Sequence, residues 1–167
     1  MSSNSGDRGG VPVSGDIQRY LAFSLGTEEY AVPLLSVKEV IAIPEVTSIP
    51  SAAAHFLGIM NLRGTIISII DLRTKLGIKS ERTSETAVII CDLETVCLGV
   101  VVNCVNSVLA LREGDIHPKP EVQSSKKTDY IRGVTRKQDK LVLLLDIAKA
   151  LDVADQKTLQ QMQGKAA

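Results

Sequence analysis

The chain has 167 residues with 19 basic and 19 acidic side chains, and aromatic residues make up only 3% of it. This balance lacks the clustered excess of Lys and Arg that nucleic-acid binding needs, and few rings are present to stack on bases. We therefore expect no nucleic-acid partner. The length supports one domain, or two small ones that share an aliphatic core.

The first 16 residues are rich in Gly and Ser and contain no apolar run, which predicts a disordered N-terminal arm over residues 1–16 rather than a signal peptide. No later run approaches the roughly 20 apolar residues of a membrane span, so we expect a cytoplasmic protein without direct membrane insertion. Cys91, Cys97 and Cys104 lie within apolar stretches. Buried thiols in a reducing cytoplasm are the simplest interpretation, and a small cysteine-dependent redox protein is the alternative.

Alternating patterns begin after this arm. Residues 19–25 and 30–34 alternate apolar and polar side chains around a polar turn, which predicts a β-hairpin. Ser36 then has N-cap chemistry with Glu39 three residues later, a capping-box spacing that predicts a short amphipathic helix ended by Pro44. The apolar stripe of this helix would consist of Val37, Val40 and Ile41.

The stretch from Gly58 to Leu76 has the clearest pattern in the chain. Asn61–Gly64 is a polar turn, and residues 65–70 are nearly all β-branched, which predicts a strand buried on both faces. Asp71 follows as the N-cap of a short helix that Gly77 ends. The apolar face of this helix would carry Leu72 and Leu76.

The second half of the chain also consists mainly of short strands. We predict a surface connection over residues 113–125 and a polar C-terminal tail over residues 154–167. Asp146 is expected to cap a second short helix, whose apolar face holds Ile147, Ala150 and Leu151. The predicted strands cover residues 86–93, 95–105, 108–111, 130–135 and 141–145.

Two parts of the chain resemble each other. Residues 69–76 and residues 144–151 both read as the end of a strand, an aspartate cap and an amphipathic turn. The dipeptides Arg63-Gly64 and Arg132-Gly133 precede the two strands. This echo suggests two related β units, each closed by a short helix. Many short strands with few helices between them favour small barrels over a parallel sheet.

Candidate catalytic residues are scarce. His55 and His117 are the two histidines, and neither lies near a cysteine or carboxylate at a metal-ligand spacing. We find no phosphate-binding loop and no nucleophile elbow, so we expect no enzymatic activity, no metal and no cofactor. The most specific remaining hypothesis is an ion pair between Glu39 and Arg63 at the edge of a groove.

The order of these motifs resembles the CheW-like chemotaxis coupling proteins over roughly residues 18–152. The resemblance rests on the segments 20–30, 37–40 and 61–73, on Leu98-Gly99-Val100-Val101-Val102, and on the closing strand, aspartate and helix. It implies a mainly β fold in which two SH3-like five-stranded β-barrel subdomains pack around a shared hydrophobic core, with short helices. The domain would span residues 17–153. Its subdomains would cover approximately residues 34–85 and 86–145, completed by the N-terminal hairpin and the C-terminal helix.

The resemblance also implies a function. Such proteins are non-catalytic adaptors that couple the cytoplasmic tips of chemoreceptors to the regulatory domain of the histidine kinase CheA, as monomers that can join rings in receptor arrays. A paralogous adaptor of a non-flagellar chemosensory pathway is the alternative. By position, receptor binding would involve Val37, Glu39, Arg63, Val105 and Val108, and kinase binding would involve Ile43, Val46 and Gly58.

Three positions depart from the pattern of the family. Asn103 stands where an aspartate is common, Ala53 where a proline is usual, and His55 where an aromatic or aliphatic residue is expected. Asn103 removes a charge close to the implied groove, so partner specificity could differ from that of typical members. We expect the fold to tolerate all three changes.

Overall fold

The structure is a computed structural model that describes residues 16–50, 52–79, 81–94, 96–119, 129–151 and 155–159. Apart from Asp16, the arm expected over residues 1–16 lies outside these residues. Of the tail expected over residues 154–167, only residues 155–159 are described.

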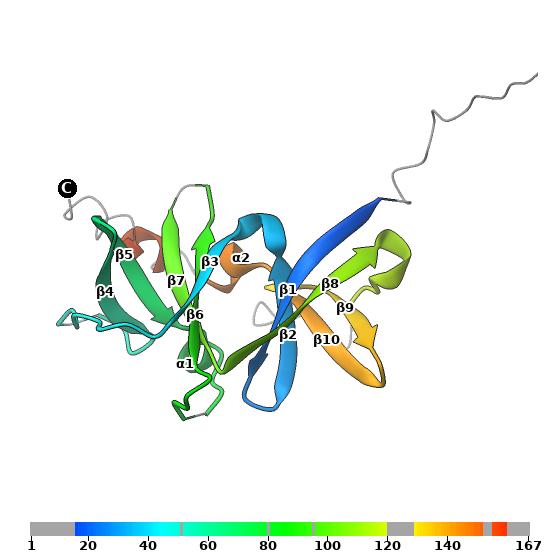
Figure 1. The fold of residues 1–167 in the computed structure, drawn as a ribbon, viewed down its shortest axis with the longest axis horizontal. Coiled ribbons are helices and arrows are strands. Elements are labelled where there is room, and N and C mark those ends of the chain that lie inside the picture. Colours follow the sequence, from blue (N-terminus) through cyan, green and yellow to red (C-terminus); the bar gives the residue numbers. More distant parts are fainter. Residues whose placement is uncertain are drawn as a thin grey trace, which may run out of the picture.

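Two five-stranded sheets form the molecule and lie side by side along its long axis (Figure 1). The first barrel contains, in spatial order, β3 (Val37–Ala42), β6 (Ala87–Asp92), β7 (Cys97–Val102), β5 (Thr65–Asp71) and β4 (Phe56–Leu62). The second barrel contains β8 (Cys104–Arg112), β1 (Ile17–Leu25), β2 (Glu28–Pro33), β10 (Lys140–Leu145) and β9 (Ile131–Lys137). This confirms the predicted mainly β fold.

Each sheet is drawn toward closure by the segment that follows one of its edge strands. In the first barrel, Thr47 after β3 exchanges backbone hydrogen bonds with Ile59 of β4, the strand at the opposite edge. In the second barrel, His117 after β8 pairs in the same way with Val134 of β9. These pairings occupy edge groups that would otherwise be open to another chain.

The two barrels are built alike, which confirms the echo between residues 69–76 and 144–151. Each contains one parallel pair, β5 with β7 and β10 with β2. Strand β5 runs into the short helix α1 (Leu72–Lys75), and β10 runs into α2 (Ile147–Ala150). The dipeptide part of the echo was wrong. The register makes Gly133 the counterpart of Gly58, not of Gly64, because each directly follows the bulge in its strand and pairs across the sheet, with Leu144 and Ile69 respectively.

Three apolar clusters explain why several strands are buried on both faces. One cluster fills each barrel, and a third lies between them and includes residues of α2, which appears between the barrels in Figure 1. In β5, Ile67 and Ile69 point into the first barrel, whereas Ile70 joins the shared core. In β1, Ala22 faces the second barrel and Phe23 the shared core. The strand predicted over residues 65–70 is confirmed, with burial on both faces from residue 67 on, whereas Thr65 is exposed and Ile66 is half-buried.

The prediction of a helix after Ser36 was wrong. Residues 34–36 form a single 3-10 turn, η2 (Leu34–Ser36), and the following residues form strand β3. The Ser36 hydroxyl donates to the Pro33 carbonyl at 2.8 Å instead of capping a helix. Side chains of β3 alternate between half-buried and exposed because the strand pairs with β6. This long-range pairing outweighs the local helical spacing.

The expected division near residue 85 does not coincide with the sheets. Strands β6 and β7, between residues 87 and 102, pair with β3 and β5, so they belong to the first barrel. The second barrel is assembled from both ends of the chain, β1 and β2 with β8, β9 and β10. Further short turns are η3 (Glu113–Asp115) and a helical turn over residues 155–159, in which Asp155 and Leu159 are buried.

Candidate partner-binding surface

Arg63 and Glu39 form the ion pair that the sequence suggested. The Arg63 guanidinium donates from Nη1 to Glu39 Oε1 at 2.6 Å and from Nη2 to Oε2 at 2.8 Å. The Arg63 side chain is 71% exposed and that of Glu39 is 29% exposed. Two parallel hydrogen bonds fix the plane of the guanidinium, which a lysine ammonium could not reproduce. The pair therefore orients an exposed positive group at the surface.

The backbone of the β4–β5 hairpin holds Arg63 in place. Arg63 and Gly64 form a two-residue loop in which both φ angles are positive, 52° and 91°. Such a loop matches the twist of the flanking strands, and glycine adopts its second position without a steric penalty. The Asn61 side chain accepts a hydrogen bond from the Gly64 N–H at 2.7 Å. The sequence signal for this turn was correct.

The same pair links the two edge strands of the first barrel, because Glu39 lies on β3 and Arg63 follows β4. The hydrogen bonds from Arg63 lower the pKa of the Glu39 carboxyl, and the carboxylate raises the pKa of the Arg63 guanidinium in turn. Both groups stay charged at neutral pH. Since the pair is exposed, solvent screening leaves it little weight in stability, and its importance lies in orientation.

Four valines lie on equivalent positions of the edge strands β3 and β8. The register around the bulge in each strand makes Val37, before the bulge, the counterpart of Val105, and Val40, after it, the counterpart of Val108. Val37 and Val105 are half-buried against the shared core, whereas Val40 is 41% exposed and Val108 is 51% exposed. We call these four residues the valine surface. Val40 was not among the predicted receptor-binding residues, because that set was carried over by position from the family resemblance and did not include it.

The implied kinase-contact residues lie on another part of the first barrel. Ile43 and Val46, in the segment after β3, are half-buried and pack against the cluster inside that barrel. Gly58 is buried, has a φ of 144°, and would bring an added Cβ within 1.9 Å of the Thr47 carbonyl oxygen. Gly58 therefore supports the segment that carries Val46 and offers no side chain to a partner.

Both predicted caps are present. The Asp71 carboxylate accepts hydrogen bonds from the N–H groups of Arg73 and Thr74, and Asp146 accepts one from Lys149. Asp71 has a second role that the sequence did not reveal. Its two oxygens each accept a hydrogen bond of 3.0 Å from the buried Arg73 guanidinium. Helix capping, with the Arg73 ion pair in the case of Asp71, gives both aspartates a structural role.

The three departures from the family pattern have different surroundings. Asn103 accepts a hydrogen bond from the Gly26 N–H at 2.8 Å, so it holds the β1–β2 turn against the junction of β7 and β8. Ala53 is exposed, and its carbonyl accepts from the Phe56 N–H at 2.9 Å. The His55 ring lies 2.7 Å from Asp155, an interaction that a purely apolar residue could not make.

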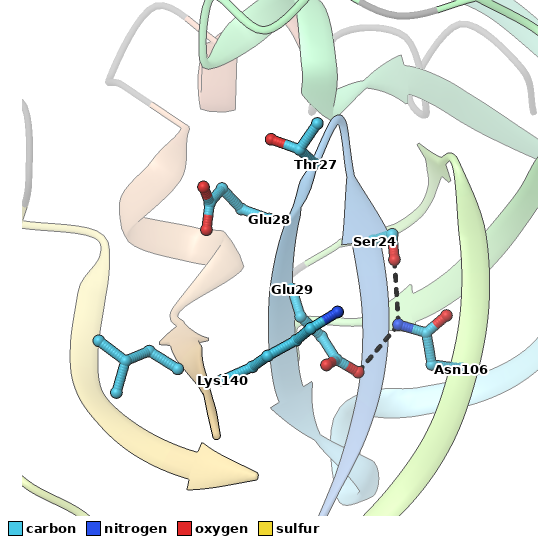
Figure 2. Close-up of a pocket in the computed structure, with 7 residues that line it drawn as sticks. Ser24, Thr27, Glu28, Glu29, Asn106 and Lys140 are labelled. Carbon is cyan, nitrogen blue, oxygen red and sulfur yellow. Dashed lines mark hydrogen bonds between the residues drawn. The ribbon is translucent and has the colours of Figure 1, made fainter. Parts of the chain in front are cut away.

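A polar depression of about 400 Å³ opens on the second barrel. Figure 2 shows the Asn106 amide between two partners, donating to Ser24 Oγ at 3.0 Å and to Glu29 Oε2 at 2.9 Å. Lys137 also binds Glu29, at 3.2 Å, and donates to Ser107, the counterpart of Glu39. These polar groups satisfy one another. In the second barrel these side chains hydrogen-bond to one another, whereas in the first barrel the Arg63 side chain remains exposed to solvent.

Two of the three cysteines, Cys91 and Cys97, are poor candidates for a redox thiol. Burial raises the pKa of the Cys91 thiol to about 12, and burial also raises the pKa of Cys97. A raised pKa leaves little thiolate at neutral pH, which is the reactive form. Among the described residues, no three His, Cys, Asp or Glu side chains gather as metal ligands, and no helix is long and apolar enough to cross a membrane.

Comparison with known proteins agrees with this architecture. The family model for the CheW-like domain matches residues 19–155. The chain belongs to the CheW family. The chemotaxis protein CheW of Klebsiella aerogenes is 36% identical over 135 residues, which cover 80% of this chain and 81% of that protein. The CheW of Treponema pallidum is 31% identical over 147 residues, covering 83% and 86%.

A solved CheW structure shares the fold. The scaffolding protein TtCheW from Thermoanaerobacter tengcongensis matches with a TM-score of 0.75 at 30% identity, over 81% of this chain and 93% of that chain. The family resemblance read from the sequence is thereby confirmed, together with the pair of SH3-like subdomains that it implied.

Proposed function

We propose that this CheW-family protein is a non-catalytic scaffold that couples chemoreceptors to a CheA-type histidine kinase in bacterial chemotaxis. The observation that carries the proposal is the valine surface, which lies on both barrels beside the shared core, with the Arg63–Glu39 pair on β3 and its neighbouring hairpin. Apolar side chains that remain exposed next to an oriented charge are typical of a protein-binding surface.

The receptor side would be an amphipathic helix of the chemoreceptor tip. Such a helix can lay its apolar stripe on Val37, Val40, Val105 and Val108, in the helix-in-groove mode. Arg63 would then meet a carboxylate or a backbone carbonyl at the edge of the helix. Because Glu39 already fixes the guanidinium, little side-chain entropy is lost when the partner binds, so Arg63 would govern orientation and partner choice.

The kinase side would be the segment that carries Ile43 and Val46. The regulatory domain of the kinase would meet the first barrel there, with Gly58 acting through the position of Thr47. Contacts between unlike surfaces can close into rings when their rotation allows, which fits a protein that is monomeric alone and recruited from the cytoplasm to membrane-associated receptor arrays. Receptor state would reach the kinase as a difference in affinity between signalling states.

The decisive experiment is co-sedimentation of the protein with a receptor cytoplasmic fragment and a CheA-type kinase, with autophosphorylation measured in parallel. We expect a ternary complex with raised phosphorylation that Arg63→Ala abolishes. Arg136→Ala, at an exposed arginine of β9, is the matched control and should behave as wild type. A protein that binds kinase but no receptor would instead be an accessory or pathway-specific adaptor. Binding of neither partner would refute the coupling role.

A further inference from the structure

The helical turn over residues 155–159, which we call the C-terminal clasp, is fastened to the first barrel by one carboxylate. Asp155 Oδ1 lies 2.7 Å from His55 Nε2, and Asp155 Oδ2 lies 2.6 Å from Lys75 Nζ. The Asp155 side chain is only 5% exposed, and Leu159 at the end of the clasp is completely buried in the shared core. Both interactions are therefore shielded from solvent.

The charges in this cluster determine which groups donate hydrogen bonds and which group accepts them. A carboxylate paired with an ammonium group only accepts hydrogen bonds, so His55 donates from Nε2 and Lys75 donates from Nζ. Buried ion pairs contribute little net stability, but the loss of one partner leaves the others unpaired away from water. Such a cluster fixes one arrangement of its elements more than it adds to the free energy of folding.

The two donors belong to different parts of the first barrel. His55 immediately precedes β4, its ring packs on Phe56 with 4.8 Å between centroids, and its carbonyl accepts from the Asp71 N–H at 2.8 Å. Lys75 is the last residue of α1. On its other side the clasp contacts α2, because Gln156 Nε2 donates to the carbonyls of Ala148 and Leu151. One turn thus joins α1, α2 and the start of β4.

We propose that Asp155 is a positioning residue for the kinase-contact segment of the first barrel. By holding His55, the clasp sets where β4 begins, and β4 carries Gly58 and Ile59, on which Thr47 and its neighbour Val46 rest. The ion pairs and side-chain hydrogen bonds of the clasp reach α1, α2 and the residue before β4 but neither β3 nor β8, so we expect its release to shift this support more than the valine surface. The functional half of the inference rests on the proposed kinase contact; the structural half does not.

Hydrogen–deuterium exchange on the free protein tests the structural half. Asp155→Asn keeps the shape of the side chain but removes the charge that holds Lys75. We expect amide exchange in the clasp and in residues 55–60 to accelerate about tenfold or more, while β8 is unchanged. Lys75→Met should give the same pattern and Lys75→Arg should restore slow exchange. Asp139→Asn, in the exposed β9–β10 turn, is the control. Unchanged exchange in both Asp155→Asn and Lys75→Met would overturn the proposal.

Binding measurements test the functional half. We expect Asp155→Asn to weaken binding to the kinase regulatory domain about fivefold or more and to leave binding to a receptor fragment within about twofold. Equal weakening of both would indicate general unfolding and would overturn the positioning role, as would faster exchange without any change in kinase affinity. If the wild-type protein binds no kinase, the proposed function fails and the positioning role fails with it. The exchange data then still decide whether the clasp exists.

Discussion

The substitution Gly58→Ala tests how the first barrel closes. An added Cβ would lie 1.9 Å from the Thr47 carbonyl oxygen and 2.6 Å from its carbon, which are backbone atoms that cannot rotate away. The two hydrogen bonds between Thr47 and Ile59, of 2.8 and 2.9 Å, must therefore break or stretch. At about 1 kcal/mol each they account for about 2 kcal/mol.

Backbone strain adds to this loss. The φ of 144° at Gly58 lies in a region that L-residues rarely adopt, at a penalty of about 1–3 kcal/mol. The sum is about 3–5 kcal/mol, a large part of the stability of a domain of this size.

Two control substitutions separate the steric cause from the backbone strain. The Cβ added by Gly64→Ala would meet no atom within 4 Å, so only the positive φ of this position opposes it, and the protein should lose about 1 kcal/mol of stability.

Gly133→Ala is the second control, in the other barrel. Its Cβ would lie 2.8 Å from the Ile116 side chain and 2.9 Å from the His117 carbonyl oxygen, a milder overlap that should reduce stability by about 1–3 kcal/mol. Urea unfolding followed by far-ultraviolet circular dichroism gives all three values, since the protein lacks tryptophan. A Gly58→Ala protein within 1 kcal/mol of wild type, or less affected than Gly133→Ala, would refute this account of barrel closure.

The remaining predictions concern substitutions of single side chains. Arg63→His should abolish receptor binding and leave the thermal midpoint near wild type, because the Arg63 side chain is 71% exposed; a large drop in the midpoint would assign Arg63 to the fold instead. Val108→Met should also weaken receptor binding with little loss of stability, and Val40→Asp should do the same, which binding isotherms with a receptor fragment would measure. Asn103→Asp should keep the bond to Gly26, since a carboxylate is also an acceptor, whereas Asn103→Leu should lose about 1–3 kcal/mol in urea unfolding. The thiol of Cys91 should stay unreactive toward a thiol reagent at pH 8. The folded protein should also lose stability as the pH rises above about 9, because the thiol of the unfolded chain then releases a proton that the folded chain holds until about pH 12. Cys91→Ala should remove that part of the pH dependence of stability.

These predictions separate two kinds of residue within the implied binding set. Val108 and Arg63 are exposed, so their substitution should change binding and not folding. Gly58 is buried against backbone, so its substitution should change binding only through the fold. A loss of kinase binding in Gly58→Ala would therefore be no evidence that a partner touches this residue.

Local chemistry in the sequence was enough to determine several features. Asp71 and Asp146 follow apolar strands and have the side chain that caps a helix, and both do so. The turn at Arg63-Gly64 and the strand over residues 65–70 also followed from residue types alone, because turn conformation depends on adjacent residues and a run of β-branched residues favours a strand. The order of these motifs was specific enough to indicate the family.

Tertiary structure decided the rest. Residues 37–42 have a helical spacing, yet they form an edge strand because pairing with β6, about fifty residues later, satisfies the backbone and places Val37 against the shared core. The division of strands between barrels was also hidden, since β1 and β2 pair with partners about a hundred residues away. Sequence chemistry predicted the pair of Glu39 and Arg63, but only the folded chain brings together His55, Lys75 and Asp155. Local signals fix turns and caps, whereas strand partners and buried charge clusters depend on contacts between distant residues, which no local pattern encodes.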